Sequence, residues 1–307
     1  MSSFQPGERR VDVGSLSLGY LEYGDPSNRS VIMVHGLGDS AWSLDPLAQT
    51  LARTHRVFSF DLRGHGRSDW GAYTLAHFVG DLRGAVETLE LERPIVIGHS
   101  LGGHAASQFC GIYPEIPSAA VIIEGLGPPP NRRAESDPDG HQRDYWQQVI
   151  ERVRRPARSR PHESLDAAIE RFQRAHPLLD PARAAFLVEK NTKDRGDGSV
   201  EWRFDPETRD WLAGHDHERA EQRWRGVACP TLVVLGNEAW ERFWQPNMIM
   251  SQDLDGPMSE AELARRLANF ANVQYLTMEG AGHMVHYDKP DELNMAVGEF
   301  VSSLPPA

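Results

Sequence analysis

Two kinds of apolar pattern alternate along the chain. Short runs of mostly apolar residues predict strands buried on both faces; they lie at Ser30–Gly36, Arg56–Asp61, Pro94–Ser100, Ala119–Gly125, Pro230–Gly236 and Val273–Glu279. Segments with apolar residues three or four positions apart predict helices; they lie at Thr74–Leu91, Leu101–Tyr113 and Pro290–Leu304. The alternation predicts an α/β fold with a mostly parallel sheet and helices on both faces. The pattern at Arg9–Tyr23 predicts an antiparallel hairpin at the sheet edge.

The alternation of predicted strands and helices stops between Pro128 and Gly226. The segment has the short strand-like run VEWRF, but its other apolar residues recur at helical spacing, bounded by proline and glycine. We therefore predict a core formed by residues 1–127 and 227–307, with a helical cap inserted at 128–226. Residues 131–160 hold eight arginines against five acidic residues, which favours a solvated helix face over a site for an anionic substrate group.

The segment Gly98-His99-Ser100-Leu101-Gly102 matches the pattern G-x-S-x-G, with a predicted strand before it and a predicted helix after it. A sharp strand-to-helix turn would hold the Ser100 hydroxyl exposed, and side chains larger than glycine would clash there. The start of the helix would aim backbone N–H groups at the reacting centre. Ser100 is therefore the predicted nucleophile.

With these motifs the chain resembles the α/β-hydrolase family. HGLGDSAWS (35–43) looks like the family's oxyanion loop, DLRGHGRSD (61–69) like its turn after the next strand, and GAGHMVH (280–286) like its histidine loop. The resemblance implies an α/β-hydrolase fold with an eight-stranded, mostly parallel sheet. It also implies an oxyanion hole made by the backbone N–H groups of Leu37 and Leu101, with Gly36 allowing close approach to the substrate.

Thirteen histidines could supply the base that a serine nucleophile needs, so position must choose among them. His283 follows the last predicted strand, in a loop that the resemblance puts beside Ser100. His286 is the nearest rival, whereas His99 and His104 flank the nucleophile and are interpreted as structural. We expect no metal, because the GHDHE segment and the His283/His286 pair lack a third ligand at a recognisable spacing.

The acid that should orient the base has two candidates. In most α/β-hydrolases it follows the strand after the cap, but the corresponding position here is Ala239, and Glu238 lies one position early. Some members, such as haloalkane dehalogenases and certain lactonases, carry it after the preceding strand, where this chain has Glu124. Neighbouring parallel strands end at the same sheet edge, so Glu124 is our preferred acid and Glu238 the fallback.

The composition argues against nucleic acid as a general partner and against a membrane-spanning segment. A net charge of −12 argues against general nucleic-acid binding, and no apolar run is long enough to span a membrane. The N-terminal residues lack a secretory signal, so we expect a cytoplasmic location. Trp42 and Trp240 are predicted pocket walls, and together with the cap they indicate a small, hydrophobic substrate.

The sequence thus predicts a serine hydrolase that cleaves a carboxylic ester or a lactone through an acyl-enzyme, without a cofactor. One alternative is C–C bond hydrolysis or acyl transfer by the same triad. Another is a weakly catalytic ligand-binding receptor with this fold. A homodimer formed through the cap helices is an option that the sequence leaves open.

Overall fold

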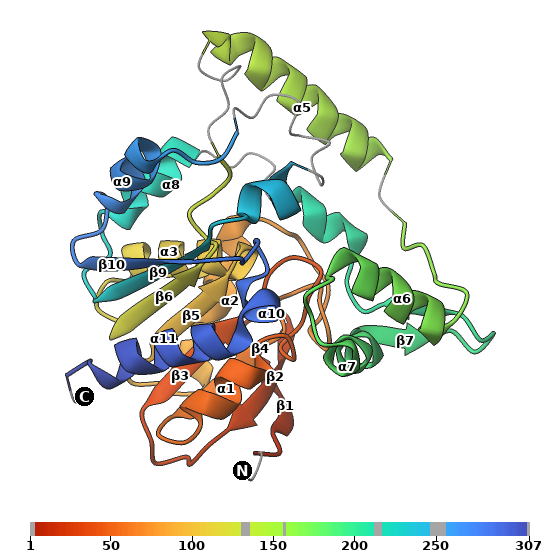
Figure 1. Cartoon of the computed structure of the whole chain (residues 1–307), viewed down its shortest axis with the longest axis horizontal. Coiled ribbons are helices and arrows are strands. Elements are labelled where there is room, and N and C mark those ends of the chain that lie inside the picture. The colour runs from red at the N-terminus through yellow and green to blue at the C-terminus, as the bar shows by residue number, and fades with distance from the viewer. Residues whose placement is uncertain (1–3, 130–135, 156–157, 212–216, 246–255, 306–307) are drawn as a thin grey trace.

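The computed structural model describes residues 4–129, 136–155, 158–211, 217–245 and 256–305. One eight-stranded sheet runs through the molecule in the order β1-β2-β4-β3-β5-β6-β9-β10 (Figure 1). Its strands are β1 (Gly7–Asp12), β2 (Ser17–Tyr23), β3 (Ser30–Val34), β4 (Arg56–Phe60), β5 (Ile95–His99), β6 (Ala119–Ile123), β9 (Thr231–Gly236) and β10 (Val273–Met278). The pairs β1·β2 and β2·β4 are antiparallel and all the other neighbours are parallel, which confirms both the predicted sheet and the edge hairpin.

Helices cover both faces of this sheet. They are α1 (Asp45–Leu51), α2 (Leu75–Thr88), α3 (Leu101–Ile112), α8 (His217–Trp224), α9 (Glu260–Leu267), α10 (Val285–Asp288) and α11 (Pro290–Ser302). Apolar residues of α2, α3, α8 and α9 pack on one face, and those of α1, α10 and α11 pack on the other. Successive strand residues serve the two faces in turn: Val96 belongs to the first core, Ile95 and Ile97 to the second. This is why the inner strands read as uninterrupted apolar runs. The prediction of burial on both faces is wrong for β10, which lies at the sheet edge and is mostly exposed.

The segment between β6 and β9 carries the remaining elements: α5 (Pro138–Arg154), α6 (Leu165–Ala175), α7 (Pro181–Asn191), β7 (Thr192–Asp194), β8 (Val200–Trp202), the 3₁₀ turn η1 (Pro206–Asp210) and α8. α5 stands apart from the sheet, and α6 and α7 lie beside it (Figure 1). The first three residues of the run VEWRF form β8, which pairs with β7. α8, by contrast, packs on α3, where the Trp224 indole donates to Ser107 Oγ at 3.0 Å.

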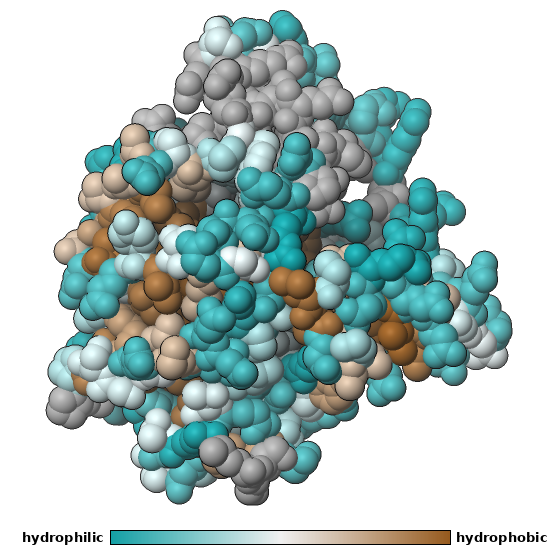
Figure 2. Space-filling model, in the orientation of Figure 1, coloured by the Kyte–Doolittle hydropathy of each residue, from teal (hydrophilic) through white to brown (hydrophobic). Residues whose placement is uncertain are grey.

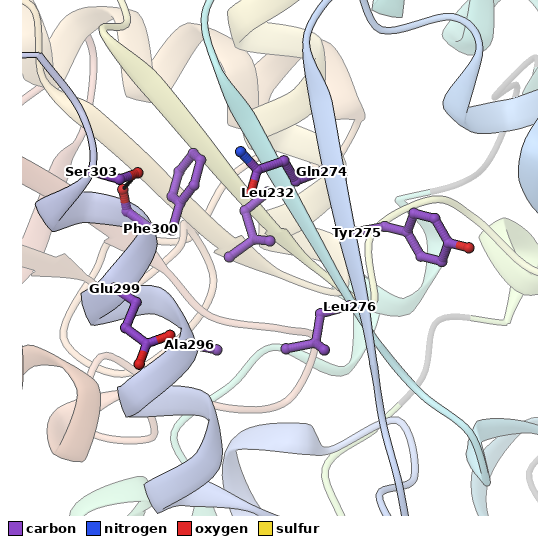
Figure 3. A pocket seen from close by; sticks show the side chains of 8 residues that line it. All are labelled: Leu232, Gln274, Tyr275, Leu276, Ala296, Glu299, Phe300 and Ser303. Carbon is purple, nitrogen blue, oxygen red and sulfur yellow. Dashed lines mark hydrogen bonds between the residues drawn. The ribbon is translucent and has the colours of Figure 1, made fainter.

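The β10 edge exposes apolar side chains. Tyr275 and Leu276 of β10 and Met295 of the neighbouring α11 are exposed, and Figure 2 shows hydrophobic residues gathered on this side of the molecule. A groove between β10 and α11 is lined by residues that include Leu232, Leu276 and Phe300 (Figure 3). Its lining includes neither Ser100 nor His283, so this groove is separate from the candidate active site. No helix among the described residues is long and apolar enough to cross a membrane.

Candidate active site

Ser100 stands in the sharp turn between β5 and α3. Its backbone adopts φ 51° and ψ −116°, a conformation that a non-glycine residue rarely takes. A Cβ on Gly98 would lie 2.2 Å from the carbonyl oxygen of Gly102, and one on Gly102 would lie 2.4 Å from that of Val34. The glycines of the motif are therefore required by backbone packing around a strained serine.

Ser100, His283 and Glu124 form a hydrogen-bonded row. Ser100 Oγ lies 2.9 Å from Nε2 of His283, and Nδ1 of the same ring lies 2.9 Å from Oε2 of Glu124. The side chains of His283 and Glu124 are 3% and 6% exposed. The second carboxylate oxygen, Oε1, accepts the Gly236 N–H at 2.7 Å. A carboxylate held at both oxygens in a buried site fixes the ring orientation and can stabilise positive charge on it.

Glu124 owes its place to the sheet. β6 lies between β5, which leads to Ser100, and β9, which ends at Gly236. The Glu124 N–H donates to the Val234 carbonyl, and its φ of 50° turns the chain out of the strand. The parallel strands thus bring three sequence-distant groups to one edge.

The rival residues lie elsewhere. The Glu238 side chain is 46% exposed and pairs with Arg242 at 3.5 Å. His286 is buried, with Nε2 3.5 Å from Asp39 Oδ2. Of the two predicted acids, the structure brings Glu124, and not Glu238, to the His283 ring.

The loop of Gly36, Leu37 and Gly38 faces the start of α3. A Cβ on Gly36 would lie 2.8 Å from Nδ1 of His99 and 3.1 Å from Cβ of Ser100, so only glycine fits there. Leu101 is the first residue of α3, and the N–H groups in a first helical turn have no intrahelical acceptor.

Two buried histidines support this loop. His35 Nε2 accepts the Leu62 N–H at 3.0 Å, and His65 Nε2 accepts the Gly38 N–H at 3.0 Å. Accepting at Nε2 requires neutral rings. Burial lowers the pKa of His35, and burial together with neighbouring His35 lowers the pKa of His65 to about 3. The neutral forms that the hydrogen bonds require are thus the forms that the surroundings favour.

A third buried histidine supports the base. His99 Nε2 donates to the carbonyl oxygen of His283 at 2.9 Å. Burial, and then the neighbouring His286 and His283, hold the pKa of His99 well below its usual value. His104 packs its ring against Trp211, with the ring centroids 5.2 Å apart. The structural roles expected for His99 and His104 stay predictions.

Aromatic residues that the sequence did not single out contact the base. The Phe243 ring stacks on His283, with centroids 4.0 Å apart and planes 18° apart, and Trp244 meets the same ring at 5.5 Å and 68°. Both belong to η2, a π-helical turn at Trp240–Trp244 that is separated from β9 by three residues. The aromatic-rich run WERFW is the sequence signal for these contacts. Only Trp240, which is half-buried and starts the turn, is predicted from this run as part of the site.

Trp42 contacts α7, which belongs to the segment between β6 and β9. Its ring meets Phe186 of α7 at 5.4 Å, and the Lys190 ammonium lies 4.5 Å above it. Arg183 donates to the Trp42 carbonyl at 2.5 Å and pairs with Asp45 at 3.4 Å. Trp42 thus docks α7 on the loop that follows Gly38, and its predicted role as a pocket wall stays a prediction.

No group of three or more His, Cys, Asp or Glu side chains in the described parts of the chain is arranged to hold a metal ion. The row of Ser100, His283 and Glu124 is an arrangement that can serve nucleophilic chemistry.

The fold and the arrangement of this site are those of the α/β-hydrolase class. The sequence model of the alpha/beta hydrolase family matches residues 31–296, and the chain belongs to that family. It is 30% identical to the putative carbamate hydrolase RutD of Caulobacter vibrioides, over 95% of this chain and 98% of that protein. It is 26% identical to the mouse sn-1-specific diacylglycerol lipase ABHD11, over 98% and 90%.

A solved structure has the same fold. E-2-(acetamidomethylene)succinate hydrolase superposes with a TM-score of 0.74 at 22% identity, covering 97% of this chain and all of that one. Other relatives are matched over only part of their length. This chain spans 56% of a serine hydrolase-like protein of zebrafish. The likenesses thus establish a hydrolase family and fold, and leave the bond and the substrate to be argued from the site.

Proposed function

We propose that this protein is a serine hydrolase that cleaves a carboxylic ester or lactone through an acyl-enzyme. The observation that carries the proposal is the row of two 2.9 Å contacts from Ser100 through His283 to the buried Glu124 carboxylate. A serine hydroxyl becomes an effective nucleophile when a base takes its proton, and an oriented imidazole is the usual base.

The steps follow from this arrangement. Ser100 Oγ bonds to the carbonyl carbon while its proton moves to Nε2 of His283, and Glu124 stabilises the imidazolium through Nδ1. The N–H groups of Leu37 and Leu101 stabilise the oxyanion. When the tetrahedral intermediate collapses, the C–O bond to the leaving alcohol breaks and the alcohol takes the proton from His283. Water, deprotonated by His283, then attacks the acyl-enzyme and releases the acid and Ser100.

We propose that the pocket lies between the core edge and the cap. Its walls would include Gly36, Trp42 and Trp240. Phe204, which follows β8, forms a β-bridge with His65 and therefore stands near the oxyanion loop. With the core at 1–127 and 227–307 and the cap at 128–226, the cap would determine which substrate fits.

A carbamate is a second candidate bond. The RutD relative carries that activity in its name, and a carbamate presents the same carbonyl to Ser100. Carbon–carbon hydrolysis and acyl transfer would use the same residues with another leaving group or acceptor, so the assay must separate them.

The test is turnover of matched esters, lactones and carbamates by the full chain and by Ser100→Ala, with Ser303→Ala, a change far along the sequence in the surface groove, as the control. We expect Ser100-dependent hydrolysis, fastest on esters or lactones. A fluorophosphonate probe should also add its mass to Ser100 and not to the variant. Carbamates as the best substrates would replace the ester assignment. No Ser100-dependent turnover or labelling would favour a ligand-binding receptor.

A further inference from the structure

The imidazole of His283 has a partner on one ring face as well as at both nitrogens. Its edge nitrogens meet Ser100 and Glu124, and the Phe243 ring lies almost parallel to it, at 4.0 Å between centroids and 18° between planes. The Trp244 ring packs edge-on against Phe243, with ring centroids 5.1 Å apart and planes at 85°. The base is thus packed against an aromatic face within the range over which a cation is attracted to a π system.

The aromatic turn is fastened to the loop that carries the base. The Arg242 side chain donates to the Gly280 carbonyl at 3.2 Å and pairs with Asp288 at 3.2 Å. Asp288 also accepts the Gly282 N–H at 2.8 Å, one residue before His283. Phe243 directly follows Arg242, so the same ion pair that orders the histidine loop holds the phenyl ring over it.

Two further hydrogen bonds join the residues before the turn to the loop that carries His283. The Asn237 side chain accepts the Gly280 N–H at 2.8 Å, and the Glu238 N–H donates to the Ala281 carbonyl at 2.9 Å. The turn that carries Phe243 and the loop that carries His283 are therefore hydrogen-bonded to each other. The stack of the two rings is in place before a reaction begins and needs no rearrangement to form.

We propose that Phe243 is a positioning residue that stabilises the imidazolium form of His283 during acyl transfer. The negative face of a phenyl ring attracts a cation and interacts far less with the neutral imidazole. His283 is a cation only after it has taken the Ser100 proton. The stack therefore stabilises the tetrahedral states more than the resting enzyme, which is the condition for a faster chemical step. This inference rests on the proposed function, since it needs His283 to act as the base.

A graded change of ring electrons separates this role from packing. Phenylalanines carrying one, two and three fluorine atoms keep the ring's shape while weakening its negative face, and they can replace Phe243 individually. We expect kcat on an ester with slow acylation to fall stepwise, by about three- to thirtyfold across the series, while KM changes little. Phe243→Leu should lose as much as the most fluorinated ring, and Phe243→Trp should retain activity if it folds.

The matched control is the same series at Phe270. That ring also stacks on an aromatic partner, Trp224, at 5.3 Å and 24°, within the apolar core. Fluorination there should leave kcat unchanged. Thermal unfolding of each variant reports packing losses separately from the trend in rate.

The outcomes are distinguishable. A flat fluorination series at Phe243, in a protein with Ser100-dependent turnover, would overturn the role of the ring and leave the proposed function standing. An equal decline at Phe270 would assign the effect to packing and also overturn it. Absence of Ser100-dependent turnover in the unaltered protein would overturn both proposals.

Discussion

Replacing Glu124 by glutamine is the sharpest perturbation of the proposed triad, because it keeps the shape and removes the charge. Glu124 Oε1 accepts the backbone N–H of Gly236, and Oε2 accepts Nδ1–H of His283. A glutamine has one acceptor oxygen for these two donors. The fixed Gly236 N–H would claim that oxygen, and the amide NH₂ would then face Nδ1 of His283.

That arrangement favours the wrong tautomer. Nδ1 would become the acceptor and Nε2 would carry the proton, so Nε2 could no longer take the proton of Ser100. We expect kcat/KM on a p-nitrophenyl ester to fall about a thousandfold or more, equivalent to about 4 kcal/mol of transition-state stabilisation. Circular dichroism and thermal unfolding should confirm that the variant is folded.

The matched control is Glu238→Gln. Glu238 is about half exposed and its ion pair with Arg242 is 3.5 Å long, so its loss should change unfolding free energy by no more than about 1 kcal/mol and activity by little. Near-full activity in Glu124→Gln, with a thousandfold loss in Glu238→Gln, would refute the assignment of the acid.

Three further outcomes test the scaffold around the site. Because the pKa of buried His65 is about 3, the unfolded chain takes up a proton at this residue below its usual pKa of about 6.5, and the folded chain does not. Urea unfolding should therefore show stability falling between neutral pH and about pH 5, with about 2 kcal/mol of the loss due to His65, and His65→Gln should lose less by about that amount. In Gly98→Ala the new Cβ would overlap the Gly102 carbonyl at 2.2 Å, so ester turnover should drop at least about a hundredfold; an active, normally stable variant would contradict the packing argument. Arg63→Met would leave Asp81 buried and unpaired after losing contacts of 2.5 and 2.7 Å, and should lower the unfolding free energy by about 3–5 kcal/mol in denaturant titration; a loss below about 1 kcal/mol would show that Asp81 is solvated or neutralised.

Local patterns were enough to place the core strands, the helices flanking them and the turn that carries Ser100. Each depends on interactions close in sequence: apolar runs for buried strands, helical spacing for α2, α3 and α11, and glycines around a strained serine. Helix and strand bounds differed from expectation by a few residues at most, as at α2, predicted from Thr74 to Leu91 and found at Leu75–Thr88. For the small strand pair β7·β8 between β6 and β9, the only sequence signal was the run VEWRF.

Contacts between loops could not be predicted from local sequence patterns. The sequence left both Glu124 and Glu238 open as the acid, because each follows a strand that ends at the same sheet edge. The strand order and the backbone turn after β6 put one carboxylate on the His283 ring, while the other faces solvent beside Arg242. Phe243 lies in the aromatic-rich run WERFW, which does not show which ring meets the base.

The amino-acid sequence by itself therefore determined the family, the mixed sheet and the candidate nucleophile, because these leave periodic or short-range signatures. The resemblance to that family pointed to the candidate base. Only the tertiary structure decided which acidic side chain meets the base, that Trp42 joins the core to α7, and that an aromatic face lies on His283. Such contacts join residues more than a hundred positions apart or depend on the direction in which a side chain leaves its loop. Their geometry is fixed by how the strands and loops pack together, and no local sequence pattern encodes it.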